Sequence, residues 1–148
     1  MTRIKIISIL SAIALLLVVA FFVSHKKSHA FVTIGTATYE VTLAETELEQ
    51  GRGLGGRAQL ASSEGMLFIF QNPDRYSFWM KDMLFPIDII WADAEKNIIF
   101  MKENALPDDY PNTYVPDKQA LYVLEISSGE IARNHFALGE KMYVAEAK

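Results

Sequence analysis

The sequence contains no cysteine, which excludes disulfides and thiolate metal sites. Histidine is scarce as well. His25 and His29 lie next to an N-terminal apolar run, and His135 stands alone near the other end of the chain. A zinc site built from imidazoles is therefore not expected. Several aspartates lie in a late loop, but without the spacing of a calcium loop, so we predict no metal and no cofactor.

Basic residues are few in the larger part of the chain. Residues 31–148 hold 10 basic and all 18 acidic residues, a net charge of −8, whereas residues 1–30 hold four basic residues and no acidic one. Nucleic-acid binding requires a positive surface that an acidic domain lacks. We therefore expect no nucleic-acid partner, and we expect repulsion from anionic surfaces.

A single long apolar run is present, at the N-terminus. Residues 4–23 are nearly all apolar, with Lys5, Ser8 and Ser11 as the exceptions. At about 1.5 Å of rise per residue, a helix of this length crosses a hydrocarbon layer of about 30 Å. The run predicts a transmembrane anchor. The alternative is a signal peptide cut after residue 30, although the apolar core of a signal peptide usually has about 7–15 residues.

Either interpretation divides the chain in the same way. Residues 1–30 form a membrane anchor or signal segment with a short basic linker, and residues 31–148 form a soluble β domain. Arg3 and Lys5 favour an N-terminus on the cytoplasmic side, although Lys26 and Lys27 weaken that bias. We expect the domain to be membrane-anchored and extracytoplasmic, in the periplasm or at the cell surface.

The remaining apolar runs are short, rich in aromatic and β-branched residues, and bounded by turn formers, which is typical of strands. Thr46 and Glu49 fit a capping box for a short helix, and Ser127-Ser128-Gly129-Glu130 predicts a second helix with a serine cap. The fold class is mainly β, a compact antiparallel β-sandwich or half-open barrel with two short helices, preceded by the transmembrane helix. Strands are expected at residues 31–34, 39–43, 66–70, 76–85, 87–91, 98–101, 121–126 and 142–145, with a long loop at 104–119.

Residues 51–57 contain four glycines and resemble a phosphate loop. The segment lacks the Gly-Lys-Ser/Thr ending and the preceding buried strand of such loops. A flexible turn that brings Arg52 and Arg57 to the sheet is the better interpretation.

Charged residues inside apolar strands mark the candidate site. Asp88 and Glu125 are the acids most deeply set in such strands, and a buried carboxylate needs a cation or N–H donors to stay charged. One interpretation is a salt-bridged lock that fixes strand register. The other is a pocket for a small polar ligand or glycan, or for a small cation, with an aromatic platform. The candidate ligand-binding residues are Trp79, Lys81, Asp88, Glu125, Arg52 and Arg57.

The same residues leave three functions open. The first is a membrane-anchored ligand-binding or accessory module. The second is a hydrolase of envelope polysaccharide, with Asp88 and Glu125 as paired carboxylates about 5–10 Å apart. The third is a purely structural interaction domain. No Gly-x-Ser-x-Gly elbow or Ser-His-acid set is present, so the sequence does not decide whether the chain is an enzyme.

Several short motifs occur along the chain: Gly53-Leu54 with Arg57, Gly65-Met66-Leu67-Phe68, Phe78-Trp79-Met80-Lys81, Pro86-Ile87-Asp88, Tyr122-Val123-Leu124-Glu125 and Gly129. In order and spacing they resemble those of the domain-of-unknown-function 192 family over roughly residues 32–144. The resemblance implies a compact, mainly-β domain, often behind an N-terminal export signal, and it implies no established activity. Departures occur at Gly55-Gly56 and at Gly139-Glu140-Lys141.

Overall fold

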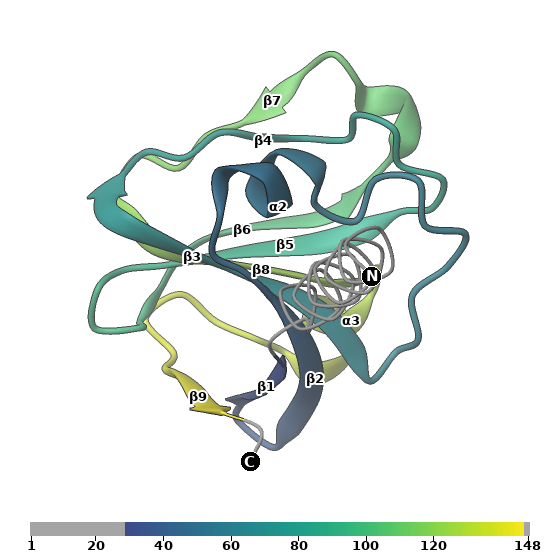
Figure 1. Ribbon diagram of the computed structural model, residues 1–148. Coiled ribbons are helices and arrows are strands. Elements are labelled where there is room, and N and C mark those ends of the chain that lie inside the picture. The colour runs from purple at the N-terminus through teal and green to yellow at the C-terminus, as the bar shows by residue number, and fades with distance from the viewer. Residues whose placement is uncertain (1–28, 147–148) are drawn as a thin grey trace, which may run out of the picture.

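A computed structural model describes residues 29–146 and is built around one curled sheet of seven strands (Figure 1). The sheet has the order β6-β5-β8-β3-β2-β1-β9, and a small second sheet pairs β4 with β7. The strands are β1 (His29–Ile34), β2 (Ala37–Ala44), β3 (Glu64–Asp74), β4 (Phe78–Trp79), β5 (Ile87–Ala92), β6 (Ile98–Ala105), β7 (Thr113–Tyr114), β8 (Ala120–Ser127) and β9 (Met142–Glu146). The helices are α2 (Glu47–Arg52), the 3-10 helix η1 (Pro107–Asp109) and α3 (Glu130–Asn134).

The mainly-β fold with two short α-helices is confirmed. The predicted membrane or signal segment lies outside the described residues. Among residues 29–146, no helix has the length and apolar content that crossing a bilayer requires.

The consecutive strands β1–β2 and β5–β6 form antiparallel hairpins. A wholly antiparallel sheet, however, was a wrong expectation, because β2 and β3 run parallel, with Val41 opposite Gly65. Parallel neighbours cannot be joined by a tight turn and need a long crossover connection. Residues 45–63, which carry α2 and the glycine-rich segment, supply that crossover.

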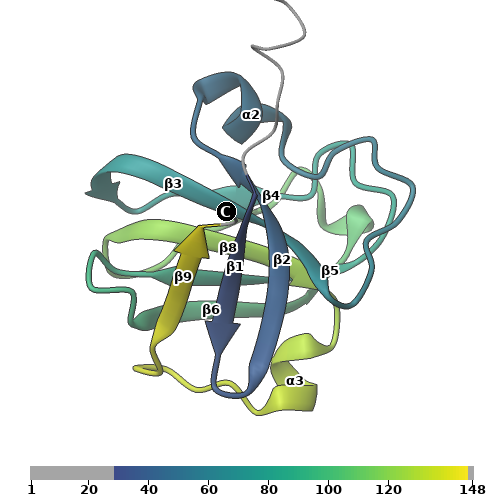
Figure 2. The ribbon, with the colours of Figure 1, turned by 60° about the horizontal axis from the view of Figure 1, so that its bottom comes forward.

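The sheet curls until its two edges approach each other, which produces the half-barrel (Figure 2). The strands β6 and β9 stand at opposite ends of the strand order. Backbone hydrogen bonds nevertheless join their ends: Ile98 N–H donates to Glu140 O at 2.8 Å, and Met142 N–H donates to Lys96 O at 2.9 Å. These bonds satisfy part of the edge that an open sheet would leave unpaired.

Strand alternation gives the sheet two apolar faces. One core joins residues from both ends of the strand order, including Val32, Leu124 and Ile98, and therefore fills the inside of the curl. The second core, including Phe68 and Trp91, lies on the other face, where residues 45–63 and the β4–β7 sheet cover it. The candidate site forms within this second layer.

Two local predictions were wrong. The expected strand at residues 76–85 is reduced to β4, and a turn follows in which Met83 N–H donates to Met80 O and Asp82 takes φ +57°. The serine cap of α3 is also absent. Gly129 is the N-cap without a side-chain hydrogen bond, and Ser128 Oγ donates instead to Asn104 Oδ1 at 2.8 Å. The apolar content of residues 76–85 alone suggested a strand. The turn is favoured because it buries Met80 and Met83 in the second core.

Candidate ligand-binding site

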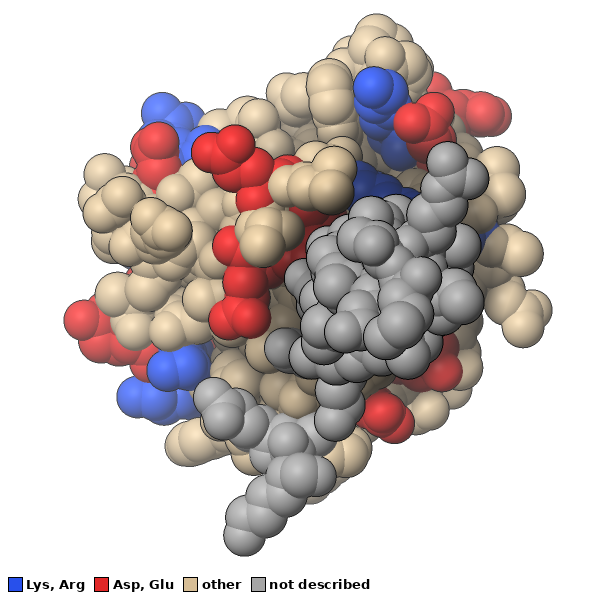
Figure 3. Space-filling model, viewed as in Figure 1, with Lys and Arg blue, Asp and Glu red and all other residues tan. Residues whose placement is uncertain are grey.

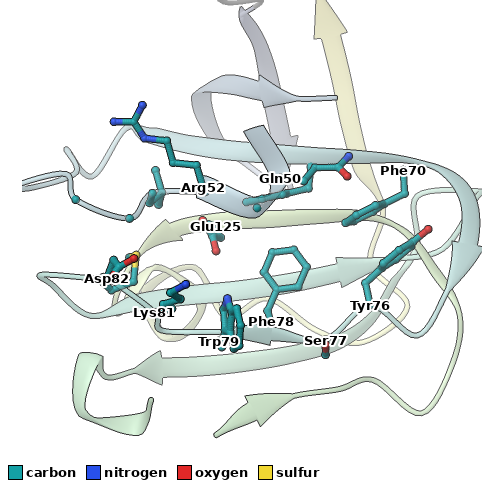
Figure 4. A pocket seen from close by; sticks show the side chains of 17 residues that line it. Gln50, Arg52, Phe70, Tyr76, Ser77, Phe78, Trp79, Lys81, Asp82 and Glu125 are labelled. Atoms are coloured by element: carbon teal, nitrogen blue, oxygen red, sulfur yellow. The ribbon is translucent and has the colours of Figure 1, made fainter. Parts of the chain in front are cut away.

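Residues 45–63 and the β4–β7 sheet together form a cover layer over the second core. A cavity of about 470 Å³ opens in this layer, between the glycine-rich segment and the turn after β4 (Figure 4). This volume falls in the range of roughly 300–1,000 Å³ that is usual for small-molecule sites. The lining residues are Gln50, Gly51, Arg52, Gly53, Leu54, Gly55, Gly56, Phe68, Phe70, Tyr76, Ser77, Phe78, Trp79, Lys81, Asp82, Met83 and Glu125.

The roof of the cavity begins with α2, where the predicted capping box is confirmed. Thr46 Oγ1 accepts a hydrogen bond from Glu49 N–H at 3.3 Å, and the Glu49 carboxylate accepts one from Thr46 N–H at 3.0 Å. The helix ends at Gly53, whose φ of +52° favours glycine. A methyl group on Gly53 would lie 3.4 Å from the Phe68 ring and 3.7 Å from Glu125 Oε2. The bare glycine therefore keeps space open above the carboxylate.

The glycine-rich segment is a turn rather than a phosphate loop, as the sequence indicated, and its N–H groups bond within the protein. Gly53 N–H donates to Glu49 O, Gly55 N–H to Arg52 O, and Gly56 N–H to Asp82 O at 2.8 Å. A phosphate-binding loop needs free N–H groups that point at the ligand. The internal pairing therefore argues against phosphate binding. The bond to Asp82 also ties the roof to the turn after β4.

Aromatic rings form the apolar wall of the cavity. Phe68 and Phe78 meet edge to face with ring centroids 4.8 Å apart, and Phe78 packs in the same way on the buried Trp91 at 5.5 Å. Phe70 and Tyr76 stack with centroids 3.5 Å apart. Trp91 Nε1–H donates to Tyr76 O at 2.9 Å, which fixes this wall to the sheet below. Such ring contacts stabilise the wall by about 0.5–1.5 kcal/mol each.

Glu125 lies at the floor of the cavity with only 4% of its surface exposed. The Leu54 backbone N–H donates to its carboxylate, but Oε2 has no hydrogen-bond partner in the structure. Burial raises the pKa of Glu125 to about 8, and the Arg57 charge and the Leu54 N–H oppose that shift only in part. The floor of the cavity therefore holds a carboxyl group whose buried Oε2 has no hydrogen-bond partner.

Three of the other predicted site residues share the cavity with Glu125. Trp79, Lys81 and Arg52 all line the cavity, and all three are exposed. The Lys81 ammonium lies 5.7 Å from the centroid of the Trp79 ring, close enough for a cation–π contact. Figure 4 shows the Lys81 nitrogen and the Trp79 indole nitrogen directed towards Glu125, whereas the Arg52 guanidinium points away.

The structure does not bring Asp88 into this group. Asp88 is fully buried, and its carboxylate accepts hydrogen bonds from Asn104 N–H at 2.8 Å and from Ile131 N–H at 2.9 Å. In the β5–β8 register, Asp88 lies opposite Ile126, while Glu125 lies opposite Ile89. Adjacent positions along a strand point to opposite faces, so the sheet separates the two carboxylates. They do not form the acid–base pair that a glycoside hydrolase would need.

Arg57 also stands apart from the cavity lining. It lines a second, smaller cavity of about 250 Å³ at the edge of β1, β2 and β3, together with His29 and Glu64. Its charge still acts on Glu125, as the pKa of that carboxyl group shows. Within residues 29–146, no three His, Asp or Glu side chains gather closely enough to hold a metal ion.

Sequence reasoning missed several lining residues. Asp82 interrupts an apolar run visibly, yet only the turn after β4 places it at the cavity. Gln50 follows the capping-box helix, and its side-chain amide donates to Ala44 O and Ile69 O, which ties α2 to two strands. Tyr76 reads as an ordinary strand aromatic. The parallel crossover that brings these segments together leaves no local signal in the sequence.

Comparisons with known proteins agree with this fold. A crystal structure of a protein of unknown function from Novosphingobium aromaticivorans DSM 12444 is 34% identical, with a TM-score of 0.72 over 78% of this chain and 83% of that one. A protein from Sinorhizobium meliloti 1021, described as a candidate transcription regulator, is 26% identical, with a TM-score of 0.74 over 80% and 94% of the two chains. No curated protein matches the chain. The family model described as "Uncharacterized ACR, COG1430" matches residues 30–144, so the chain belongs to the uncharacterised DUF192 family.

Proposed function

We propose that this protein is a binding module for a small, uncharged polar ligand that donates a hydrogen bond to Glu125. The observation that carries the proposal is the unpartnered Oε2 of a carboxyl group that is 4% exposed and lines a cavity. Leaving a buried polar atom unsatisfied costs about 1–3 kcal/mol, and more for a charged group. A ligand that supplies the missing donor recovers this free energy on binding.

The two buried acids support different roles. Asp88 has both carboxylate oxygens occupied by backbone N–H groups, which is the arrangement of a structural lock. Glu125 has one oxygen free, and neither Lys81 nor Arg57 forms an ion pair with it. A residue that only fixed strand register would gain from pairing both oxygens. The free oxygen of Glu125 therefore favours ligand binding over a purely structural role at this position.

The charges around the cavity favour an uncharged ligand over a small cation. The ammonium group of Lys81 already occupies a cation–π position beside Trp79. A cationic ligand would meet this like charge. A neutral molecule with hydroxyl or amide groups avoids that repulsion.

The test is ligand-observed NMR on the full chain, kept in solution with a mild detergent, against a library of sugars, polyols, amides and amino acids. At least one compound should bind the native protein and lose about tenfold or more in affinity in Glu125→Gln, which corresponds to about 1.4 kcal/mol. Glu103→Gln, an exposed position on β6, is the matched control and should bind normally. A library without any binder, or unchanged affinity in Glu125→Gln, rejects the proposal.

We also propose that residues 4–23 hold this module at the outer side of a membrane. The support is the apolar run, together with Arg3 and Lys5 at its start, which favour an N-terminus on the cytoplasmic side. The full chain should partition with membranes and be digested by protease added to the outside of spheroplasts. A version without residues 1–28 should remain in the soluble cytoplasmic fraction. Full-length protein that is soluble, or protected from external protease, would contradict this placement.

A further inference from the structure

Going beyond the proposed function, and resting on it, we infer that the ligand is a neutral saccharide chain whose end unit enters the cavity and whose next unit lies on Trp79 and Tyr110. Two features support this inference. One is the chemistry that faces the cavity around Glu125. The other is an exposed pair of aromatic rings that continues outward from the cavity wall.

The polar groups inside the cavity fit hydroxyl groups. Glu125 Oε2 lacks a partner, and the nitrogens of Lys81 and Trp79 are directed towards it (Figure 4). A hydroxyl group both donates and accepts hydrogen bonds, so it can donate to the carboxylate and accept from the N–H groups at the same time. An ammonium ligand has no acceptor for Lys81, and a carboxylate ligand can hydrogen-bond to Glu125 only while Glu125 carries its proton, whereas a hydroxyl group suits both protonation states of Glu125. Hydroxyl groups set close together on one small molecule are the mark of a sugar.

The apolar wall fits the other side of a sugar ring. Phe78 is buried at the base of the cavity, and the stacked rings of Phe70 and Tyr76 stand beside it. The C–H groups on one face of a pyranose make an apolar surface, which packs on aromatic rings with little polar desolvation. A polar side formed by Glu125 and Lys81 and an aromatic side formed by these rings thus match the two faces of one sugar unit.

The aromatic surface does not stop at the mouth of the cavity. Trp79 lines the cavity and is 47% exposed, and Tyr110, which lies outside the cavity lining, is 46% exposed. Their ring centroids are 5.8 Å apart. Two adjacent half-exposed rings leave a large apolar area in water directly beside the site. A second sugar unit linked to the first would cover that area.

The charge of the domain selects among saccharides. Acidic side chains gather over α2, near the roof of the cavity (Figure 3), and Glu47 and Glu49 in its first turn are exposed. With a net charge of −8 on residues 31–148, the domain repels uronic-acid or phosphate-bearing polymers. The inference is therefore restricted to neutral chains.

The experiment is an NMR titration of the full chain with β-1,4-linked N-acetylglucosamine and with α-1,4- and β-1,4-linked glucose, each at lengths of one to four units. In at least one series, affinity should rise about three- to tenfold from one unit to two or three, because an added aromatic contact contributes that much. Tyr110→Leu should lose the gain with length while binding the single sugar normally, and Tyr110→Phe should keep it. Tyr143→Ala, at an exposed aromatic position on β9, is the control.

The outcomes separate this inference from the function on which it rests. Affinity that is independent of chain length, or a length gain that persists in Tyr110→Leu, overturns the inference and leaves the binding module in place. Glu125-dependent binding of small molecules without binding of any saccharide does the same. Capture of a protein at Trp79 and Tyr110, with no effect of saccharides, assigns the aromatic pair to a protein partner and also overturns the inference. Absence of every Glu125-dependent ligand rejects both proposals.

Discussion

At the scale of single residues, the two buried acids show how far a sequence can be interpreted. Their positions inside apolar strands identified Asp88 and Glu125 as buried, and both are. Whether they meet depends on the register between β5 and β8, where a shift of one residue would exchange the faces. No local pattern encodes that register. The prediction of burial was therefore correct, while the grouping of the two carboxylates in one cluster was not.

The raised pKa of Glu125 predicts a specific dependence of stability on pH. The carboxyl group has a pKa of about 8 in the folded protein against 4.5 in the unfolded chain, so the folded state binds more protons between these values. Stability must then fall as the pH rises from about 4.5 to about 8. Each pKa unit corresponds to about 1.4 kcal/mol, so the loss amounts to several kcal/mol.

Urea unfolding at intervals from pH 5 to 9 measures this effect. Glu125→Gln removes the titrating group, so its free energy of unfolding should change less with pH than that of the native protein, and the variant should be the more stable of the two at pH 9. Glu103→Gln should follow the native curve. Parallel curves for the native protein and Glu125→Gln would show that Glu125 titrates normally.

At the scale of elements, Asp88 links β5 to two other segments. Its carboxylate accepts the N–H of Asn104 at the end of β6 and the N–H of Ile131 in the first turn of α3, where a serine cap was expected. Asp88→Asn keeps the shape but turns one acceptor into a donor that faces an N–H group. We expect a loss of about 3–5 kcal/mol of stability by urea unfolding. Asp117→Asn, at an exposed surface ion pair, should change little. A near-native stability for Asp88→Asn would show that Asp88 contributes little to fixing α3.

Alanine substitutions at Gly53 and Gly51 differ in the backbone φ angle and in the space around the added methyl group. Gly53→Ala puts a methyl group at φ +52° and into the space above Glu125, so it should lower stability by about 1 kcal/mol or more and weaken ligand binding. Gly51 has an ordinary φ inside α2 and nothing within 4 Å of an added Cβ, so Gly51→Ala should be neutral or slightly stabilising. Thermal unfolding and NMR titration measure both effects. Equal behaviour of the two variants would contradict the role of Gly53 in the roof.

Elements with strong local signals were predicted well. Alternation identified β1, β2 and β8, and the capping box identified α2. Residues 76–85 were wrongly predicted as one strand, because apolar side chains of the turn after β4 are buried in the second core and give the segment a strand-like composition. The serine cap of α3 was wrongly predicted for a similar reason. The acceptor for the Ile131 N–H is the carboxylate of Asp88, which is distant in the sequence. Local patterns carry no information about partners that tertiary contacts supply.

At the scale of the whole molecule, the charge predicts the behaviour towards DNA. The similar protein from Sinorhizobium meliloti is described as a candidate transcription regulator. For this chain, the net charge of −8 on residues 31–148 should prevent measurable binding to duplex DNA at about 0.1 M salt. Fluorescence anisotropy with mixed-sequence duplexes measures this, with a basic DNA-binding protein as the positive control. Binding that weakens as salt increases would contradict the expectation.

The number and length of the predicted strands were enough to predict a half-barrel. The order in which the chain connects those strands was not predicted. Placing β3 parallel to β2 requires residues 45–63 to leave one edge of the strand pair and return to the same end. That path forms the roof of the cavity. The site residues contributed by the roof were therefore predicted only as far as Arg52 and Arg57, of which Arg52 alone lines the cavity.

The parallel pairing of β2 and β3 has a practical consequence. The crossover starts and ends at strands whose register is fixed by the sheet. Its internal sequence can therefore be exchanged without changing the order or direction of the strands. Grafting crossovers of different length or polarity between Glu45 and Ser63, with Leu54 retained above Glu125, would keep the strand that carries Glu125 while reshaping the roof of the cavity. The domain thus offers a ready frame for recognition modules of altered selectivity.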